Sequence, residues 1–181
     1  DKNFTYLITC SRTGTQAIVD AAIDTSEIAQ FLRNDPVAIL ITHGHSDHIA
    51  FLDNYVKDYP GATILGHPDS RLKEGYPNFK KVDKTQEFII GEMRFKCIHT
   101  PGHYFDSICY QISPVLFTGD TMFVGRTGRI KGKYSSIEDL YDSIYNKILK
   151  MPGSLKIYPG HDYGNKPNIT LEENVLNSPL L

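Results

Sequence analysis

Four potential metal ligands lie within six positions of one another. His43, His45, Asp47 and His48 form the pattern His-x-His-x-Asp-His directly after the apolar run 37–41. Such a run predicts a buried strand, so the ligands are expected on the loop at its C-terminal end. Imidazole and carboxylate groups suit zinc, iron and manganese alike. The pattern therefore predicts a metal-binding loop and leaves the identity of the metal open.

Three further strand ends carry one candidate ligand each. His103, Asp120 and His161 follow the apolar runs 93–98, 115–118 and 155–158, and a glycine precedes each of them. Glycine lets the backbone turn tightly, so that the next side chain can point inward. With the first loop they make seven ligands, enough for two metal ions that share one carboxylate.

The remaining pattern predicts the elements that position these ligands. Further strands are expected at 4–9, 16–20, 62–65 and 107–112, with a β-hairpin over 87–98. Helices are expected over 27–33 behind a Thr25 or Ser26 cap, over 49–57, and from Ser136 to about Lys150. Strands dominate early and helices recur after them, which indicates a layered α/β protein with sheets at its centre.

Two polar residues outside these motifs have competing interpretations. Asp20 ends a predicted strand and is either a group that supports the metal loop from beneath or a surface turn residue. His67 stands beside Pro68 without a neighbouring ligand, so we interpret it as a loop histidine.

Composition narrows the class of protein. The 181 residues are 40% hydrophobic and 22% charged, which predicts one domain over 1–181 with a sizeable core. A net charge of −2 without a basic block disfavours nucleic-acid binding, and no apolar run reaches the roughly 18 residues of a membrane span. Three scattered cysteines, Cys10, Cys97 and Cys109, indicate a reducing compartment, hence the cytoplasm.

The four motifs together resemble the metallo-β-lactamase superfamily over nearly the whole chain. The resemblance implies an αββα sandwich, with two mixed sheets flanked by helices and the metal site at one edge. It also implies a division of the ligands between two divalent metal ions, of which zinc is the first expectation. His43, His45 and His103 would bind one ion, Asp47, His48 and His161 would bind the other, and Asp120 would bridge them.

Within the superfamily, the chain is most similar to the glyoxalase II (hydroxyacylglutathione hydrolase) and persulfide dioxygenase branch. The stretch 118–129, which includes Gly125-Arg126-Thr127-Gly128-Arg129, carries this likeness, as do 170–173 and Asn177-Ser178-Pro179 in the tail. In that branch the residues at the positions of Arg129 and Tyr163 contact glutathione. An exposed arginine and a packed tyrosine are the alternative interpretations.

The chain also departs from that branch. Asp20-Ala21 stands where Asp-Pro is usual, Phe105-Asp106 replaces Pro-Gly, and 131–134 differs from the usual substrate loop. The C-terminal helical domain with which full-length glyoxalase II holds glutathione is not expected in this sequence. The unguarded side of the site could then be completed by a second copy in a homodimer.

Three functions remain at this stage. The first is hydrolysis of a glutathione thioester by a metal-bound hydroxide, with Asp47 and Asp120 as catalytic carboxylates. The second is an iron-dependent persulfide dioxygenase that uses the two-histidine, one-carboxylate face of His43, His103 and Asp120. A non-catalytic metal-binding protein is a weaker third. Zinc β-lactamase activity is disfavoured because many such enzymes have cysteine at the position of Asp120.

Overall fold

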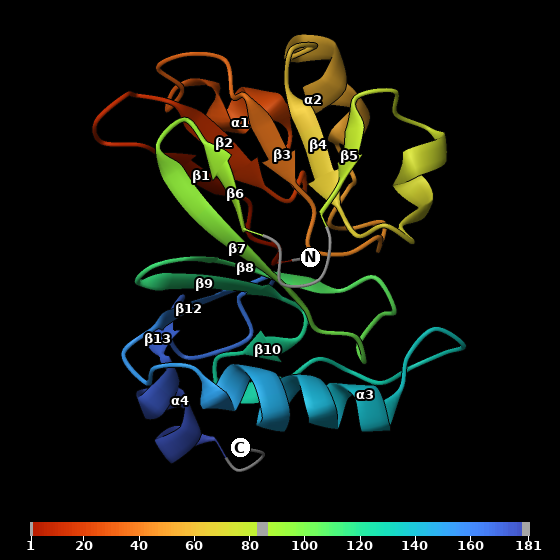
Figure 1. Ribbon diagram of the computed structural model, residues 1–181, viewed down its shortest axis with the longest axis vertical. Coiled ribbons are helices and arrows are strands. Elements are labelled where there is room, and N and C mark those ends of the chain that lie inside the picture. The colour runs from red at the N-terminus through yellow and green to blue at the C-terminus, as the bar shows by residue number, and fades with distance from the viewer. Residues whose placement is uncertain (1, 83–86, 179–181) are drawn as a thin grey trace.

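A computed structural model describes residues 2–82 and 87–178, and Pro179 of the tail motif lies outside these ranges. Two sheets lie face to face, with helices on both outer sides (Figure 1). α1 (Thr25–Ala29) and α2 (Leu52–Asp58) cover the first sheet, and the helical segment from α3 (Ile137–Tyr141) onward covers the second. The expected αββα sandwich is confirmed. None of the described helices is long and apolar enough to cross a membrane.

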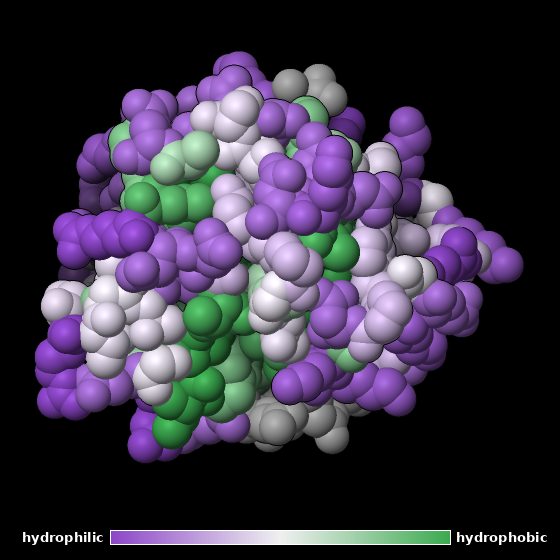
Figure 2. All heavy atoms as spheres, turned by 90° about the horizontal axis from the view of Figure 1, so that it is seen from above, coloured by the Kyte–Doolittle hydropathy of each residue, from purple (hydrophilic) through white to green (hydrophobic). Residues whose placement is uncertain are grey.

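The first sheet has five strands in the order in which they occur along the chain. They are β1 (Tyr6–Thr9), β2 (Gln16–Val19), β3 (Ala38–Leu40), β4 (Thr63–Gly66) and β5 (Phe79–Lys81). The β1–β2 pair is antiparallel and the other pairs are parallel. Figure 2 looks onto the α1 and α2 side of this sheet, where hydrophilic side chains surround smaller apolar patches.

The second sheet has six strands in the order β13-β12-β9-β8-β7-β6. They are β6 (Glu87–Ile90), β7 (Met93–His99), β8 (Ile108–Ile112), β9 (Val115–Gly119), β12 (Lys156–Pro159) and β13 (Ile169–Thr170). The β12–β9 pair is parallel and the other pairs are antiparallel, so this sheet is mixed as well. A separate small hairpin, β10 (Met122–Phe123) with β11 (Arg126–Thr127), follows β9.

Strand alternation divides the apolar residues among three cores. In β3, Ala38 and Leu40 face the core between the sheets, whereas Ile39 faces the α1 and α2 side. In the second sheet, Phe117 faces the same central core and Leu116 packs against the α3 side. Because successive side chains of a strand point to opposite faces, an apolar run such as 37–41 fills two layers. Burial on both faces holds the strand ends, and therefore the ligand loops, in place.

Two helix starts differ from the sequence prediction. α1 is capped by Asp24, whose carboxylate accepts a hydrogen bond from the Ser26 backbone N–H, and not by Thr25 or Ser26. α2 begins at Leu52 and not at residue 49. The backbone N–H of Phe51 donates instead to the carbonyl of Ala21 at 2.9 Å, which holds this stretch against the first sheet.

The predicted helix from Ser136 is confirmed, with changes of pitch along it. Ser136 caps α3 by accepting a hydrogen bond from the Asp139 N–H at 3.1 Å. The helix then widens into η2 (Asp142–Lys147) and tightens into η3 (Ile148–Lys150). The pattern did not predict β5, β10, β11, β13, the 3₁₀ turn η1 (Arg71–Glu74) or the final helix α4 (Leu171–Asn177).

Candidate metal centre

Loops from both sheets meet at one edge of the sandwich. The loop 43–48 follows β3, His103 lies between β7 and β8, Asp120 follows β9, and His161 follows β12. Each predicted ligand therefore leaves the C-terminal side of a strand, and all seven come close enough to form three overlapping groups. Those groups are His43 with His45 and His103, His43 with His48 and Asp120, and Asp47 with His48 and His161.

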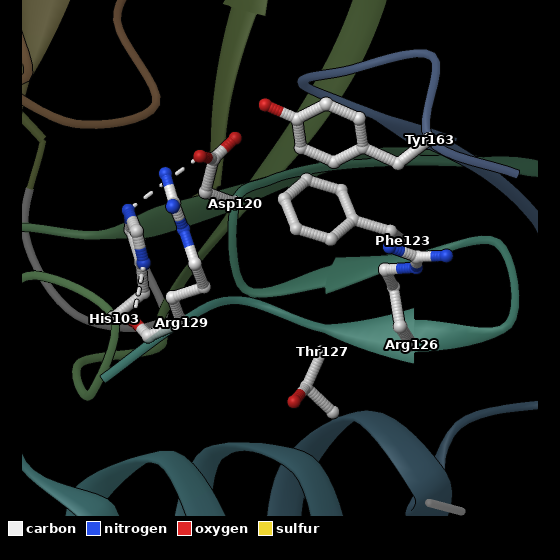
Figure 3. Close-up of a pocket in the computed structure, with 7 residues that line it drawn as sticks. All are labelled: His103, Asp120, Phe123, Arg126, Thr127, Arg129 and Tyr163. Carbon is white, nitrogen blue, oxygen red and sulfur yellow. Dashed lines mark hydrogen bonds and ion pairs between the residues drawn. The ribbon is translucent and has the colours of Figure 1, made fainter. Parts of the chain in front are cut away.

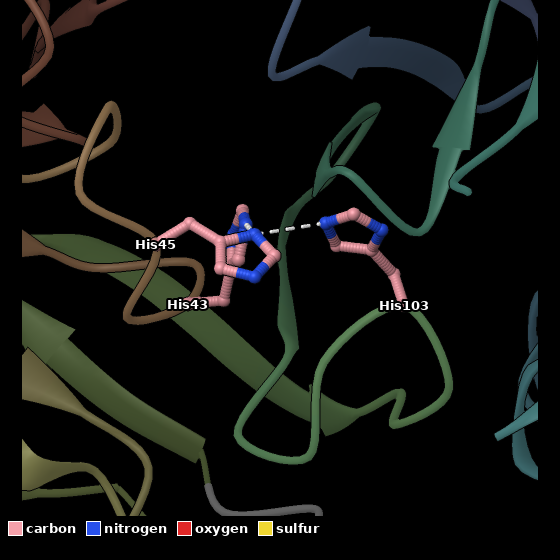
Figure 4. Close-up of side chains that lie close together, drawn as sticks. All are labelled: His43, His45 and His103. Atoms are coloured by element: carbon pink, nitrogen blue, oxygen red, sulfur yellow. Dashed lines mark hydrogen bonds between the residues drawn. The ribbon is translucent and has the colours of Figure 1, made fainter. Parts of the chain in front are cut away.

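The first group has three imidazole nitrogens facing one point (Figure 4). His45 Nδ1 lies 3.0 Å from His43 Nε2 and 3.0 Å from His103 Nε2. His103 Nδ1 donates to the carbonyl of Arg129 at 2.8 Å, so its Nε2 presents a lone pair when the ring is neutral. The hydroxyl of Thr42 donates to Asp20 and so accepts from His43 Nδ1, which leaves a lone pair on His43 Nε2 too.

Hydrogen bonds among the three rings cannot satisfy all three of the nitrogens that face this point. A single N–H on His45 cannot bond both lone pairs fully, and charging the rings would bring like charges together. A divalent cation would satisfy all three nitrogens, since metal-bound histidines ordinarily donate their other ring N–H to an oxygen. The donor set thus fits a metal ion at the first group.

The second group adds carboxylate oxygen to the imidazoles. His48 Nε2 and His161 Nε2 lie 3.3 Å apart, and His161 Nε2 lies 3.3 Å from Asp47 Oδ2. His48 Nδ1 lies 2.8 Å from Asp20 Oδ2, so this ring also turns Nε2 toward the group. Two nitrogens and one carboxylate fit a second divalent ion.

Asp120 lies between the two groups. Its Oδ1 is 3.2 Å from His48 Nε2, and its Oδ2 is 3.2 Å from His161 Nε2 and 3.5 Å from His103 Nε2. Burial opposes the charged form, but hydrogen bonds from His161 and His48 lower the pKa of Asp120 below its usual value. The carboxylate stays ionised at neutral pH, in a position to contact ions at both groups.

Burial and neighbouring charges shift the pKa values of the histidines in opposite directions. Desolvation lowers the pKa of His43, His45 and His103, which keeps these rings neutral and able to bind a metal. Burial also disfavours the charged form of His48, but the carboxylates of Asp20 and Asp120 outweigh it and raise its pKa to about 10. In the protein without metal, His48 therefore carries a proton at neutral pH.

Asp20 supports the metal loop from beneath. Its backbone adopts a φ of 58°, a conformation that aspartate tolerates better than most residues. Its carboxylate accepts hydrogen bonds from the Thr42 N–H at 2.8 Å, from the Thr42 hydroxyl at 2.7 Å and from His48 Nδ1. Of the two interpretations of Asp20, the structure selects the buried supporting group.

The two residues predicted to contact glutathione line a cavity beside the ligand groups, together with His103 and Asp120 (Figure 3). This cavity, which we call the β10 cavity, measures about 310 Å³ and includes Arg129 and Tyr163 together with Phe123. The Tyr163 ring stacks on the ring of His161, with centroids 4.7 Å apart and planes at 4°. Phe123 meets Tyr163 edge-on at 5.2 Å. Arg129 and Tyr163 thus both line the space beside the ligand groups, and their contact with a substrate stays a prediction.

Other residues at the site were not predicted. Asn3 donates to Asp47 Oδ2 at 2.9 Å, and the buried Asp106 accepts from the Gly44 N–H at 3.1 Å. Tyr104 packs its ring against His45 with centroids 4.3 Å apart, and Arg126 lines the β10 cavity. Of these, Asp106 carried a signal as part of a departure from the usual motif, and Arg126 lies in the stretch 118–129 that carries the resemblance.

His67 lies apart from the ligand groups, as the sequence predicted. It is buried at 5% exposure, and its ring stacks on His99 with centroids 4.2 Å apart. It is not a member of the three groups of described residues that could hold a metal.

Comparison with known proteins gives the same superfamily. The sequence model described as Metallo-beta-lactamase superfamily matches residues 1–161. A hydroxyacylglutathione hydrolase of Francisella tularensis subsp. novicida is 34% identical over 168 residues, which cover 90% of this chain and 64% of that protein. The "Probable polyketide biosynthesis zinc-dependent hydrolase PksB" of Bacillus subtilis is 28% identical over 179 residues, 94% of this chain and 78% of its own length.

Among solved structures, ETHE1 from Myxococcus xanthus superposes with a TM-score of 0.89 at 27% identity. The match covers 98% of this chain and 79% of that one. The chain thus spans a little under two thirds of the Francisella hydrolase and about four fifths of the ETHE1 chain.

Proposed function

The chain belongs to the Metallo-beta-lactamase superfamily and has the fold of its hydrolases, and from that premise we propose that it hydrolyses thioesters at a two-metal centre. We propose His43, His45 and His103 as ligands of one ion, Asp47, His48 and His161 as ligands of the other, and Asp120 as the bridge. Glutathione is the proposed thiol carrier, on the strength of the hydroxyacylglutathione hydrolase relatives.

The observation that carries this proposal is the position of Asp120. One oxygen faces His48 and the other faces His161 and His103, so a single carboxylate contacts both donor groups. Two bound ions would supply a hydroxide nucleophile near neutral pH and stabilise the oxyanion that develops on the carbonyl. No serine or cysteine nucleophile is then required, and the three cysteines are buried.

The protein's own groups would position the reactants. Asp120 and Asp47 hold charge at the centre, and Asn3 fixes the orientation of Asp47 through its 2.9 Å hydrogen bond. Arg129 and Tyr163 line the β10 cavity on the side of His103 and His161, where they would contact the thiol carrier.

Oxidation of a glutathione persulfide at a single iron is the second candidate. It is favoured by the face of two histidines and one carboxylate that His43, His103 and Asp120 provide. Because the chain superposes on ETHE1 over 98% of its length, both thioester hydrolysis and persulfide oxidation should be measured.

Metal content and turnover, measured on the same untagged preparation, test the proposal. We expect close to two divalent ions per chain by plasma mass spectrometry, together with hydrolysis of S-lactoylglutathione. Asp120→Asn should lose metal and lower kcat/KM by at least about a hundredfold, because charge that binds both ions is removed. The exposed Asp35→Asn, which removes a carboxylate outside the three ligand groups, is the matched control.

The second candidate gives a different result in the same experiment. The dioxygenase would be supported, and the hydrolase rejected, by one iron per chain, oxygen uptake with glutathione persulfide and no thioester turnover. Full thioester turnover by metal-replete Asp120→Asn would refute the assigned role of that residue.

A further inference from the structure

A second cavity lies directly over the proposed ligands. This cavity, which we call the histidine cavity, measures about 230 Å³ and is lined by ligands from both groups together with Arg129, Lys131 and Tyr163. It shares Arg129 and Tyr163 with the β10 cavity, whereas Lys131 belongs to the histidine cavity and Arg126 to the β10 cavity. Two adjoining spaces therefore open beside the same ligand groups, and each has a cation that the other lacks.

A thioester has two halves that must leave its carbonyl in different directions. The β10 cavity offers the larger space and the aromatic rings of Phe123 and Tyr163, which suits the thiol carrier. The acyl group would then occupy the histidine cavity, beside Lys131. The ring of Tyr104, which contacts His45, also packs against Phe105 at 4.8 Å and against Tyr134 at 5.8 Å.

The loop that carries Lys131 is anchored on both sides. The carbonyl of Arg129 accepts the hydrogen bond from His103 Nδ1, and the Ser136 N–H donates to the carbonyl of Gly102 at 2.9 Å. Arg71 donates to the Tyr134 hydroxyl at 2.7 Å, and its guanidinium lies 5.1 Å from the centre of that ring. Lys131 is thus held two residues from a direct contact with a proposed ligand.

The charge of Lys131 is not neutralised within the part of the chain that the structure describes. The ion pairs of described lysines and arginines involve Arg12, Arg94, Lys147 and Lys166. Lys131 and Arg129 are therefore two cations at one cavity without a carboxylate partner, in a chain whose net charge is −2. The carboxylates in this cavity, Asp47 and Asp120, are proposed ligands whose charge the metal ions would use.

We propose that Lys131 recognises an anionic acyl group, so that the preferred substrates are carboxyacyl thioesters with a short chain. This inference rests on the proposed thioesterase activity and names its acyl class. Water adds to the thioester carbonyl, the C–S bond breaks, and the sulfur leaves as a thiolate that takes up a proton. The products are a dicarboxylate and the free thiol.

Two thioesters of equal carbon number test the proposal on the metal-replete protein. S-succinylglutathione and S-butyrylglutathione differ by a carboxylate in place of a methyl group, and the uncatalysed rate of each is subtracted. We expect kcat/KM to favour the succinyl compound by about two- to fivefold, the scale of an exposed ion pair. Lys131→Met should abolish this ratio, and Lys131→Arg should restore most of it.

Lys133→Met is the matched control, because this lysine lies on the same loop but over the ring of Tyr134, 5.6 Å from its centre. It should leave the succinyl-to-butyryl ratio unchanged. Equal turnover of both thioesters by the unmodified protein would overturn the inference and leave the hydrolase standing. An equal loss of kcat/KM on both thioesters in Lys131→Met would also overturn the inference. It would indicate that Lys131 contacts the thiol carrier, which both compounds share. No turnover of either compound by a preparation that hydrolyses S-lactoylglutathione would overturn the acyl preference alone, whereas no turnover of all three thioesters would refute the thioesterase itself.

Discussion

At the scale of single residues, Asp20 holds both the backbone of the ligand loop and the ring of the proposed ligand His48. It is 2% exposed, and its carboxylate accepts hydrogen bonds from Thr42 and His48. We expect Asp20→Ala to cost about 2–4 kcal/mol of unfolding free energy, because buried donors lose their acceptor and alanine tolerates the positive φ poorly. Asp20→Asn should retain more stability yet weaken zinc binding by about 10- to 100-fold.

Urea unfolding and zinc competition with a chelator measure these two effects separately. Asp35→Asn, an exposed carboxylate, controls for the loss of charge. Unaltered zinc affinity in Asp20→Asn would show that Asp20 supports the fold alone.

His48 makes metal binding depend on pH. The carboxylates that raise its pKa to about 10, against an ordinary value of 6.5, keep the ring protonated in the metal-free protein. This charge stabilises the metal-free fold fully below pH 6.5, and the contribution is lost as the pH rises through 10. Metal must displace the proton, so its affinity should increase with pH over the same range.

Calorimetric titration with zinc at pH 6.0 measures that displacement, in buffers of different ionisation enthalpy. We expect release of at least about one proton per chain. Apparent enthalpies that are identical in all buffers would contradict a protonated His48.

The sequence predicted the positions of the candidate ligands better than it predicted the residues around them. His43, Asp120 and the others follow apolar runs, so local pattern alone places them at strand ends. Asp20 stayed open because its partners, Thr42 and His48, are 22 and 28 residues away and meet it through the fold. Arg126 lies in the two-residue strand β11, and Lys131 lies in the irregular segment after it. Neither stretch has a periodic pattern, so the sequence does not show which cavity these residues face.

At the scale of elements, strand ends must approach one another very closely. Gly160 follows β12, and a Cβ there would lie 2.4 Å from Asp120 Oδ1 and 2.6 Å from His48 Cε1. Gly160→Ala should therefore displace two proposed ligands, reduce bound metal and lower turnover by about a hundredfold, as for other small displacements of catalytic groups.

Gly61→Ala is the comparison for Gly160→Ala, since a Cβ at that turn meets no atom within 4 Å. Metal content and kcat/KM of the two variants give the result. Equal values would mean that the β12 end can shift without disturbing the centre.

Element prediction succeeded where a strand is long enough to show its pattern. The hairpin of β6 and β7 and the buried β3 and β9 were predicted from apolar residues alone, and all are confirmed. β13 has two residues and pairs with β12, so its conformation is set by a neighbour and not by its own sequence. The turns after His48 replace the first turn of the predicted helix because backbone hydrogen bonds with Ala21 hold them.

At the scale of the whole molecule, the candidate metal centre takes its ligands from both halves of the sandwich. His43, His45, Asp47 and His48 belong to the first sheet, whereas His103, Asp120 and His161 belong to the second. Free zinc at about 100 times its dissociation constant would add about 2.7 kcal/mol of stability. For a chain of this length that is about 5–10 °C in the melting temperature.

Calorimetry before and after treatment with a chelator tests this stabilisation. The melting temperature should fall on metal removal and return when zinc is added back. Asp120→Asn should respond less to the chelator, because it starts with less metal. An unchanged melting temperature in the unmodified protein would show that the sheets hold together without the ions.

The first described residues of the chain run alongside the metal centre. Asn3 pairs with His161 in an isolated β-bridge, the Asp162 N–H donates to the carbonyl of Lys2, and the Phe4 N–H donates to the carbonyl of Gly160. Cleavage of the chain after Asn3 would release the amide that holds Asp47. Such trimming would leave both hydrophobic sheets intact and yet divide a preparation into chains of unequal metal occupancy, so intact mass belongs beside every activity assay of this protein.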